Sequence, residues 1–247
     1  MGFKAVLDDL STFRDSIATI SEIIEETQIK IKKNGIELIA SDRAVVAVVD
    51  FKFSAKNFRE YNYESDLAIG INLANLLQIL KRARSSDITE FLVSDNKFVI
   101  TLKGESTRRF SIPLLDIREE IPQGIEKLVF PVKLEISSSA LEDGIEDADL
   151  VSDALTFEVT KDALILKAEG DSSSSELIIS KDKAKFYGEK NAKATYSLDY
   201  LKKMIKGRKI SENVIIEFDT NYPMRMTFER GSDIALSFIL APRIEEE

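Results

Sequence analysis

The second half of the chain repeats the first half. The segment 33–40 (KNGIELIA) returns at 161–168 (KDALILKA), and 110–114 (FSIPL) has a counterpart at 236–240 (LSFIL). Similarity at this spacing is typical of two domains of the same fold in one chain. We therefore expect a structure that is built by internal symmetry and not around one catalytic cleft.

Composition limits the chemistry that the chain can perform. Its 247 residues, 44% of them hydrophobic, are enough to bury a core in each of two domains. The chain has no cysteine, which excludes disulfides and thiolate chemistry, and no histidine, which is the commonest metal ligand and proton carrier near neutral pH. Much of ordinary enzymology is thereby excluded, and we expect neither catalysis nor a cofactor or metal.

The sequence also bears on location. No apolar run approaches the length that spans a bilayer, and the first residues, MGFKAV, have neither an apolar signal region nor a myristoylation site. We therefore expect a soluble protein of the cytoplasm with no membrane partner.

Charge is unevenly distributed along the chain. Its 43 acidic and 34 basic side chains give a formal net charge of −9, which as an average argues against a nucleic-acid binder. Basic residues are nevertheless dense at 81–84 (KRAR) and at 202–209 (KKMIKGRK), at corresponding places in the two repeats. Acidic residues accumulate at 142–149 and 245–247.

Four segments have the spacing of short amphipathic helices, two in each repeat. Apolar residues recur there at intervals of three and four, so they share one helix face. The four apolar stripes are Leu10, Phe13, Ile17 and Ile20; Leu73, Leu76, Leu77 and Leu80; Leu141, Ile145 and Ala148; and Leu198, Leu201 and Ile205. Ser139 and Glu142 predict a capping box for the third helix, and Gly207 predicts a left-handed residue that ends the fourth.

Nearly all of the remaining sequence is typical of short strands separated by turns, which favours antiparallel meanders. The clearest strand signals lie at 45–53, 98–102, 110–114, 155–159, 214–218, 224–228 and 234–240. Each repeat is therefore expected to lay two helices on one face of an antiparallel sheet, an α+β fold. We expect an N-terminal domain at 1–116, a linker at 117–127 and a C-terminal domain at 128–247.

The acidic run allows two interpretations. Its carboxylates offer oxygen ligands to Mg²⁺ or Ca²⁺, which would suit a carboxylate-metal hydrolase, or they form a solvated or ion-paired face of the third helix. We favour the second, because hard cations usually draw ligands from a shaped loop or from several elements. The carboxylates belong to Glu142, Asp143, Glu146, Asp147 and Asp149.

The two basic clusters are also open to two interpretations. One cluster alone would be explained as a solvated helix end, but its recurrence at matched positions favours a shared ligand. Point charges on helix faces without interleaved aromatic residues suit a regular phosphate backbone better than base stacking. We therefore expect duplex DNA, bound without regard to its sequence.

Several short motifs together resemble one family. They are 40–45 (ASDRAV), 80–82 (LKR), 109–114 (RFSIPL), 149–153 (DLVSD), 167–170 (KAEG) and 240–245 (LAPRIE). In combination they resemble the archaeal DNA polymerase sliding clamps, which are similar to proliferating cell nuclear antigen, over almost the whole chain. The resemblance implies a homotrimeric ring with the DNA clamp fold, whose helices line a channel around DNA.

The same resemblance implies how subunits meet. Free sheet edges invite pairing, and a head-to-tail ring uses them up, so the strand near Arg109 is expected to pair with the strand near Ile178 of the next subunit. The third helix departs from the family pattern, because its acids would repel DNA in the channel. We hypothesise instead that Asp143 and Asp147, four residues apart, reach Arg82, Arg84 or Arg109 of that neighbour. The interface residues implied are Arg109, Phe110, Ser111, Ile112, Asp143, Asp147, Leu177, Ile178 and Ile179.

The function implied by the resemblance is processivity, since a closed ring holds a polymerase on DNA by topology. A nucleoid-associated protein with roles in replication and repair is expected. The side chains implied to line the channel are Arg14, Lys81, Arg82, Arg84, Lys202, Lys203, Lys206 and Lys209. The alternative within the same fold is a subunit of a hetero-oligomeric clamp that does not form a ring alone.

Partner proteins are implied as well. In this family a groove beneath the linker receives short peptide motifs of DNA polymerase, clamp loader, flap endonuclease and DNA ligase. Transferred by motif, the walls of that groove are Val46, Ile121, Ile125, Pro223, Ile239, Ala241 and Pro242.

Overall fold

The structure is a computed structural model that describes residues 2–118, 121–188 and 190–244. The chain divides into two compact units. The first unit consists of Met1–Asp42, Val49–Ile121 and Arg230–Leu236. The second consists of Arg43–Val48, Pro122–Glu229 and Ser237–Glu247.

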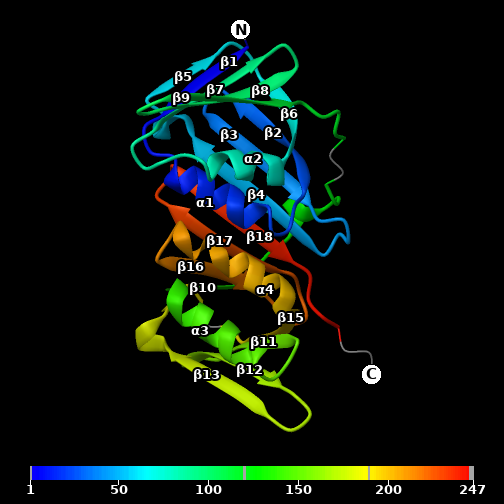
Figure 1. The fold of residues 1–247 in the computed structure, drawn as a ribbon. Helices are drawn as coiled ribbons and strands as arrows, with labels where there is room; N and C mark the ends of the chain where they lie inside the picture. Colours follow the sequence, from blue (N-terminus) through cyan, green and yellow to red (C-terminus); the bar gives the residue numbers. More distant parts are fainter. Residues whose placement is uncertain (1, 119–120, 189, 245–247) are drawn as a thin grey trace. The chain divides into compact units, whose positions relative to one another are not determined.

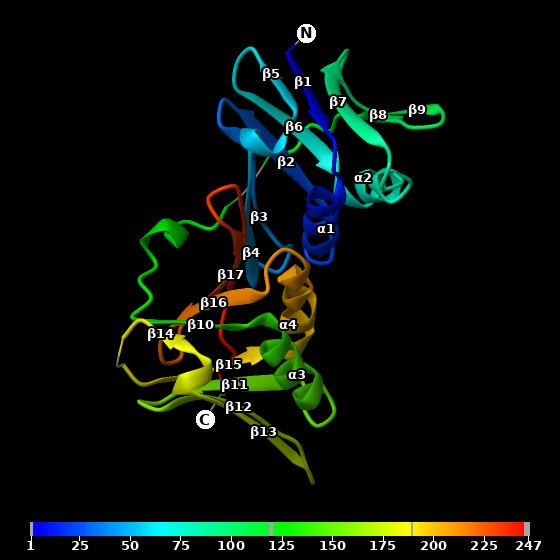
Figure 2. The same cartoon turned by 90° about the vertical axis from the view of Figure 1, so that its left-hand side faces the viewer.

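The elements follow one another in the same order twice (Figures 1 and 2). The first run is β1 (Phe3–Leu7), α1 (Ser11–Ile20), β2 (Glu26–Lys32), β3 (Gly35–Ser41), β4 (Ala47–Ser54), η1 (Ala55–Asn57), β5 (Glu60–Tyr63), β6 (Leu67–Asn72), α2 (Leu73–Leu80), β7 (Ile88–Ser94), β8 (Lys97–Lys103) and β9 (Thr107–Pro113). The second run is β10 (Val132–Ser137), α3 (Ser138–Asp149), β11 (Ala154–Val159), β12 (Ala163–Glu169), β13 (Ser174–Ser180), η3 (Lys181–Lys183), β14 (Lys185–Phe186), β15 (Ala192–Ser197), α4 (Leu198–Met204), β16 (Asn213–Phe218), β17 (Met224–Arg230) and β18 (Ile234–Leu240). The short 3-10 helix η2 (Ile125–Lys127) precedes the second run, and η4 (Ile205–Lys209) follows α4. The duplication seen in the sequence is therefore a duplication of secondary structure.

Strand pairing is duplicated too. β1 pairs with β5 and β7, as β10 pairs with β14 and β16. β2 pairs with β3 and β6, as β11 pairs with β12 and β15. All of these pairings are antiparallel, so the expected α+β fold is confirmed. Among the strands at sheet ends are β9, in the order β5-β1-β7-β8-β9, and β13, in the order β13-β12-β11-β15.

The four helices lie where the apolar stripes predict them. The stripe residues are buried, apart from Leu77, which is half-buried. Within the first unit α1 contacts α2, and within the second unit α3 contacts α4 (Figure 1). Each unit therefore carries a pair of helices on its sheets, as the periodicity indicates.

All seven strand predictions are confirmed to within three residues. They correspond to β4, β8, β9, β11, β16, β17 and β18. The remaining strands of the described chain were not among the clear signals. Their place in the fold follows from the duplication.

The predicted capping box of α3 is wrong. The helix begins at Ser138, its N-cap residue is Ser137, and no side chain caps it. Ser137 and Ser139 instead contact each other, with 2.7 Å between their Oγ atoms, and Glu142 pairs with Arg208 on η4. Glu142 is therefore used to hold the helix pair together and not to satisfy its own N-terminus.

The predicted role of Gly207 is also wrong. α4 ends at Met204 and continues into η4, and Gly207 lies inside η4 without a left-handed conformation. A Cβ atom at Gly207 would overlap the ring of Phe228 on β17. Glycine is needed here for close approach of the helix end to the sheet.

Aromatic residues tie the helices and sheets of each unit together. In the first unit the ring of Phe13 on α1 lies 5.2 Å from Phe53 and 5.5 Å from Phe91. In the second unit Phe157 lies 5.7 Å from Tyr196, centroid to centroid. Each such fully buried side chain contributes roughly 1.5–3 kcal/mol, so every unit has a core of its own.

Candidate functional site

The basic cluster at the end of α2 is exposed, and the edge strand β9 holds its backbone in place. Lys81, Arg82 and Arg84 are exposed. The side chain of Arg108, on β9, donates to the carbonyl oxygen of Arg82 at 2.9 Å and to the carboxylate of Asp87. The same carboxylate accepts the backbone N–H of Arg84 at 2.8 Å. The chain that carries the cluster is thus fixed to the edge strand.

The side chains of this cluster differ in their partners. The guanidinium of Arg84 lies 3.0 Å from a carboxylate oxygen of Glu105, and both side chains are exposed. Within the described ranges the side chains of Lys81 and Arg82 make no ion pair. Their charge is therefore available to a ligand.

The corresponding cluster on α4 and η4 is largely neutralised inside its own unit. The Nζ atom of Lys202 lies 2.8 Å from Asp149, and that of Lys203 lies 2.8 Å from Asp199. The Nε atom of Arg208 lies 2.6 Å from Glu142. Lys206 and Lys209 are exposed. The two matched clusters therefore occupy equivalent positions, but more cations of the second cluster are paired with acids of their own unit.

Arg14 is a weaker candidate for DNA contact than the other side chains predicted to line the channel. It lies on α1, is half-buried, and its Nε atom is 3.5 Å from Asp15, the next residue. Part of its charge is therefore compensated where it stands.

The acids of α3 separate into two groups. Glu142 and Asp149 pair with Arg208 and Lys202, which favours the ion-paired interpretation of the acidic run over a metal site. Asp143, Glu146 and Asp147 are exposed. Across the described ranges no three acidic side chains are grouped so that they could hold a metal ion.

Close packing brings α3 to the sheet end at β13. A Cβ atom at Gly144 would lie 2.5 Å from Leu166 on β12 and 3.4 Å from Leu177 on β13. Glycine therefore allows the helix to lie near the edge strand, with Asp143 and Asp147 exposed on either side of Gly144 in the sequence. Leu150, at the end of the helix, is 83% exposed.

The two edge strands have the same pattern of exposure. Along both β9 and β13 the residues alternate between exposed and half-buried, with a buried isoleucine at the sixth position. In β9 Phe110 and Ile112 face the core, and in β13 Leu177 and Ile179 do. Each strand pairs on one side only, with β8 and β12 respectively. Ile178 is 60% exposed, which is unusual for an isoleucine.

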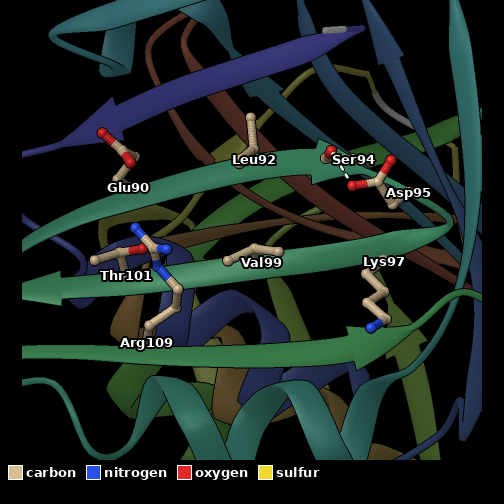
Figure 3. A pocket seen from close by; sticks show the side chains of 8 residues that line it. All are labelled: Glu90, Leu92, Ser94, Asp95, Lys97, Val99, Thr101 and Arg109. Atoms are coloured by element: carbon tan, nitrogen blue, oxygen red, sulfur yellow. Dashed lines mark hydrogen bonds between the residues drawn. The ribbon is translucent and has the colours of Figure 1, made fainter.

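Alternation along β9 separates two neighbouring arginines. Arg108 reaches the end of α2, so the adjacent Arg109 lies on the opposite face of the sheet. There it lines a hollow of about 260 Å³ over β7, β8 and β9 (Figure 3). The sequence prediction included Arg109 and missed Arg108. The apolar Phe110 and Ile112, two and four residues beyond Arg108, were the signal that could have shown Arg108 on the helix side.

Glu90 is one of the charged residues that line this hollow. Its carboxylate lies 2.9 Å from the Nζ of Lys103 and 3.2 Å from that of Lys4. Burial pushes the pKa of Glu90 upward, but the hydrogen bonds from the two lysines outweigh burial and hold the pKa below its usual value. Glu90 therefore links β7 to both β1 and β8.

The predicted partner-groove residues share one property. All seven, Val46, Ile121, Ile125, Pro223, Ile239, Ala241 and Pro242, are half-buried. Within the second unit the backbone N–H of Ala241 donates to the carbonyl oxygen of Val46 at 2.9 Å, which brings these two together. Ile121 belongs to the first unit.

The C-terminal segment beside Ala241 is anchored. The N–H of Arg243 donates to the carbonyl oxygen of Thr195 at 2.7 Å, and its guanidinium lies 2.7 Å from Asp153. The hydrogen bond from Arg243 holds the pKa of Asp153 below its usual range. Nearby Val45, 60% exposed, has a positive φ of 57°, which β-branched residues rarely adopt.

No helix in the described part of the chain combines the length and apolar character required to cross a bilayer.

Comparison with known proteins gives consistent matches. The model of the proliferating cell nuclear antigen N-terminal domain matches residues 2–119, and that of the C-terminal domain matches residues 124–243. The DNA polymerase sliding clamp of Methanothermobacter thermautotrophicus is 35% identical over 99% of both chains. That of Thermococcus onnurineus is 33% identical over 100% of both.

Solved structures agree with these relatives. PCNA from Thermococcus kodakaraensis superposes with a TM-score of 0.87 at 29% identity, covering 98% of this chain and 100% of the other. A chain of the PCNA2–PCNA3 complex from Sulfolobus tokodaii gives a TM-score of 0.88 at 26% identity, covering 97% and 99%. The two family models together span nearly all of the chain, and the chain therefore belongs to the proliferating cell nuclear antigen family.

Proposed function

We propose that this chain is a DNA sliding clamp that encircles duplex DNA and tethers the replicative polymerase to it. The observation that carries the proposal is the pair of like edge strands, β9 and β13, one in each repeat of a duplicated fold. Relatives named as DNA polymerase sliding clamps support it. A clamp acts by topology, so the chain needs no catalytic residues, and we propose none.

The edge strands support a head-to-tail assembly. Each exposes unpaired backbone N–H and C=O groups on one side, and pairing β9 of one subunit with β13 of the next satisfies both. Such pairing would bury the exposed Ile178 and bring Phe110 and Ile112 toward Leu177 and Ile179.

A counterpart of this pairing exists within the chain. In the duplicated order β18 corresponds to β9, and β4 corresponds to β13. Beside β4 and β18, the N–H of Ser54 donates to the carbonyl oxygen of Asp233 in the first unit, and that of Ala241 donates to Val46 in the second. The fold therefore already uses this type of strand association, which supports the same association between copies.

Ion pairs across the subunit boundary would adjust the stability of the closed ring. We propose that Asp143 and Asp147 of one subunit approach Arg84 of the next, because the acids lie on the helix beside β13 and Arg84 follows the helix beside β9. Arg109 lies on the other face of its strand, and the charge of Arg82 is assigned to DNA, which leaves Arg84 as the partner. Exposed pairs contribute roughly 0–1 kcal/mol each.

The DNA-facing surface that we propose is dominated by the end of α2. Lys81 and Arg82 supply uncompensated charge, while Lys202 and Lys203 of the second repeat are paired with acids. Weak contacts with phosphates suit a ring that must slide. The wider set consists of Arg14, Arg84, Lys206 and Lys209.

The partner surface is a finer proposal. Half-buried apolar residues around the Val46–Ala241 hydrogen bond would receive the peptide motifs of DNA polymerase, clamp loader, flap endonuclease and DNA ligase.

The division of the chain into domains at 1–116 and 128–247 with a linker at 117–127 stays a prediction. Gly124, with a φ of 88°, suits the linker.

A hetero-oligomeric clamp is the second candidate. The strongly acidic exposed side of α3 favours it, because such a surface would prefer a neighbour more basic than a second copy of this chain. The structural likeness to the PCNA2–PCNA3 complex supports the same fold in that setting.

Sedimentation equilibrium of the purified chain distinguishes the two assemblies. A homotrimer predicts a mass about three times the 27.8 kDa of the chain, whereas a single-chain mass favours the hetero-oligomer. Primer extension on circular single-stranded DNA then tests the function itself. Longer products on addition of the chain and a loader are expected; unchanged lengths in every subunit combination would refute the clamp proposal.

A further inference from the structure

We propose that Arg108 is a positioning residue that fixes the basic end of α2 to the edge strand β9, so that Lys81 and Arg82 are oriented for DNA. The proposal rests on the proposed clamp function. It concerns a residue that does not itself touch DNA but sets the direction of two residues that do.

The geometry places Arg108 between two parts of the helix end. Its Nη1 atom donates to the carbonyl oxygen of Arg82 at 2.9 Å, and its Nη2 atom contacts the carboxylate of Asp87. Arg82 lies two residues beyond the end of α2 at Leu80, so its carbonyl oxygen has no place in the helical ladder and finds its partner in Arg108. Asp87 accepts a second bond from the N–H of Arg84, which closes the turn that carries the cluster.

Burial makes this arrangement specific. Asp87 is 4% exposed, and the Arg108 side chain is about one quarter exposed. A Cβ atom at Gly104, in the turn between β8 and β9, would overlap the Asp87 carboxylate. The turn therefore leaves room for a charged group that must be paired, because an unpaired buried carboxylate is strongly unfavourable.

The second repeat attaches the end of α4 to its sheet without charge, and its ion pair, Arg208 with Glu142, runs between η4 and α3. The counterpart of Arg108 on β18 is Ile234, which is buried, and the end of α4 is held by packing of Gly207 against Phe228. The fold itself therefore does not require an ion pair at this position. The pair is present in the repeat whose basic cluster is uncompensated, which indicates a role in directing that cluster.

The consequence is a link between two functional surfaces. β9 is the edge strand proposed to pair with the next subunit, and Arg108 connects it directly to the backbone of Arg82. Ordering β9 at a subunit boundary would thereby order the chain that presents Lys81 and Arg82. A cationic side chain with a fixed orientation interacts with phosphates more favourably than one on a mobile turn.

The test replaces the pair by apolar residues, as in the second repeat. The double variant Arg108→Met, Asp87→Leu leaves no buried charge unpaired, so it is expected to stay folded and to keep the assembly mass of the wild type. Anisotropy with a short fluorescent duplex, titrated between about 50 and 200 mM salt, measures binding. We expect affinity to fall about three- to tenfold and the salt slope to decrease by about one, the value of one lost phosphate contact.

A matched control removes the exposed pair of the same unit. Arg59 lies 2.7 Å from Asp8, and Arg59→Met, Asp8→Leu deletes the same two charges. We expect wild-type affinity and slope for this control. The single variant Arg108→Met should melt well below the double variant, because it leaves Asp87 buried and unpaired.

The outcomes separate the two proposals. A folded double variant with wild-type affinity and slope would overturn the positioning role and leave the clamp intact. Failure of the wild-type chain to lengthen primer-extension products on circular DNA in any assembly would overturn the clamp function and the positioning role with it.

Discussion

The ammonium group of Lys202 lies between the two carboxylate oxygens of Asp149, 2.9 Å from Oδ1 and 2.8 Å from Oδ2. The equivalent cluster of the first repeat has no such acid beside Lys81 or Arg82 within the described ranges. The duplication is thus symmetric in fold and asymmetric in electrostatics. The first repeat supplies exposed cations and the second supplies exposed carboxylates.

Removing the acid beside Lys202 should strengthen DNA binding. Asp149→Asn frees the ammonium group, so duplex affinity measured by anisotropy at about 50 mM salt should rise roughly two- to fivefold. Stability should fall by less than about 1 kcal/mol, since both partners are exposed. Asp162→Asn changes net charge equally in an exposed turn at the start of β12 and serves as the control. Equal gains in both variants would show that only net charge matters.

Charge reversal should affect the two repeats unequally. Lys81→Glu with Arg82→Glu should impair clamp-dependent polymerase stimulation about tenfold, because it removes uncompensated charge and adds repulsion. Lys202→Glu with Lys203→Glu should impair it less, since those lysines are already paired. Sedimentation and partner-peptide binding should stay unchanged in the second pair. Normal stimulation by the first pair would show that the channel assignment is wrong.

The exposed acids of α3 should contribute to assembly. Asp143→Ala with Asp147→Ala is expected to raise the monomer fraction in sedimentation velocity at low micromolar concentration, an effect that high salt should mimic in the wild type. Asp162→Ala with Asp171→Ala, two exposed turn residues, removes the same charge as a control. An unchanged assembly in the α3 variant would exclude these ion pairs.

Glu90 should stabilise the first unit in a pH-dependent way. Its pKa is lowered in the folded chain, because the hydrogen bonds from Lys103 and Lys4 outweigh burial. A lowered carboxyl pKa adds stability above the unfolded value, here near 4.5, and this stability is lost as pH falls through the folded pKa. Glu90→Gln should therefore melt about 2–4 °C lower than wild type at pH 7, a shift typical of about 1 kcal/mol.

That difference should be smaller at pH 3 than at pH 7, because pH 3 lies below the unfolded value near 4.5 and the stabilisation is lost progressively as pH falls below it. Glu126→Gln, at an exposed carboxylate in η2, should leave the melting temperature unchanged at both pH values. A Glu90→Gln penalty of the same size at pH 3 and pH 7 would assign the effect to packing and not to charge.

Periodicity was sufficient for much of the fold. Stripes such as Leu141, Ile145 and Ala148 located the helices because a buried helix face has only one spacing that fits it. The repeat then supplied the strands that had no clear signal of their own. Segments such as β14, with only two residues, are formed by pairing with β10 and carry no local pattern.

Helix ends were predicted poorly because tertiary contacts decide them. Three consecutive serines, Ser137–Ser139, lie at the start of α3, and the sequence does not distinguish among them as the first residue. Ser138 donates its Oγ–H to the carbonyl oxygen of Ser211 at 3.0 Å, so a residue far along the chain determines where the helix begins. Gly207 faces Phe228 for a similar reason.

The candidate site was likewise predictable from the sequence only in part. The basic clusters were visible as runs of charge, but their compensation was not, since Lys202 and Asp149 are 53 positions apart. Alternation along β9 contained enough information to place Arg108 on the helix side. Its partner Asp87 lies beyond a turn whose geometry no spacing rule specifies.

Retention on circular DNA tests the central claim most directly. Clamps are loaded onto a nicked circular duplex, isolated by gel filtration at about 150 mM salt, and counted before and after the circle is cut once. A topological ring predicts stable retention on the circle and loss within minutes of linearisation, restored by blocking both ends with bound protein. Equal retention on circular and linear DNA would contradict the account, because it would show that the chain is held by direct binding and not by encirclement.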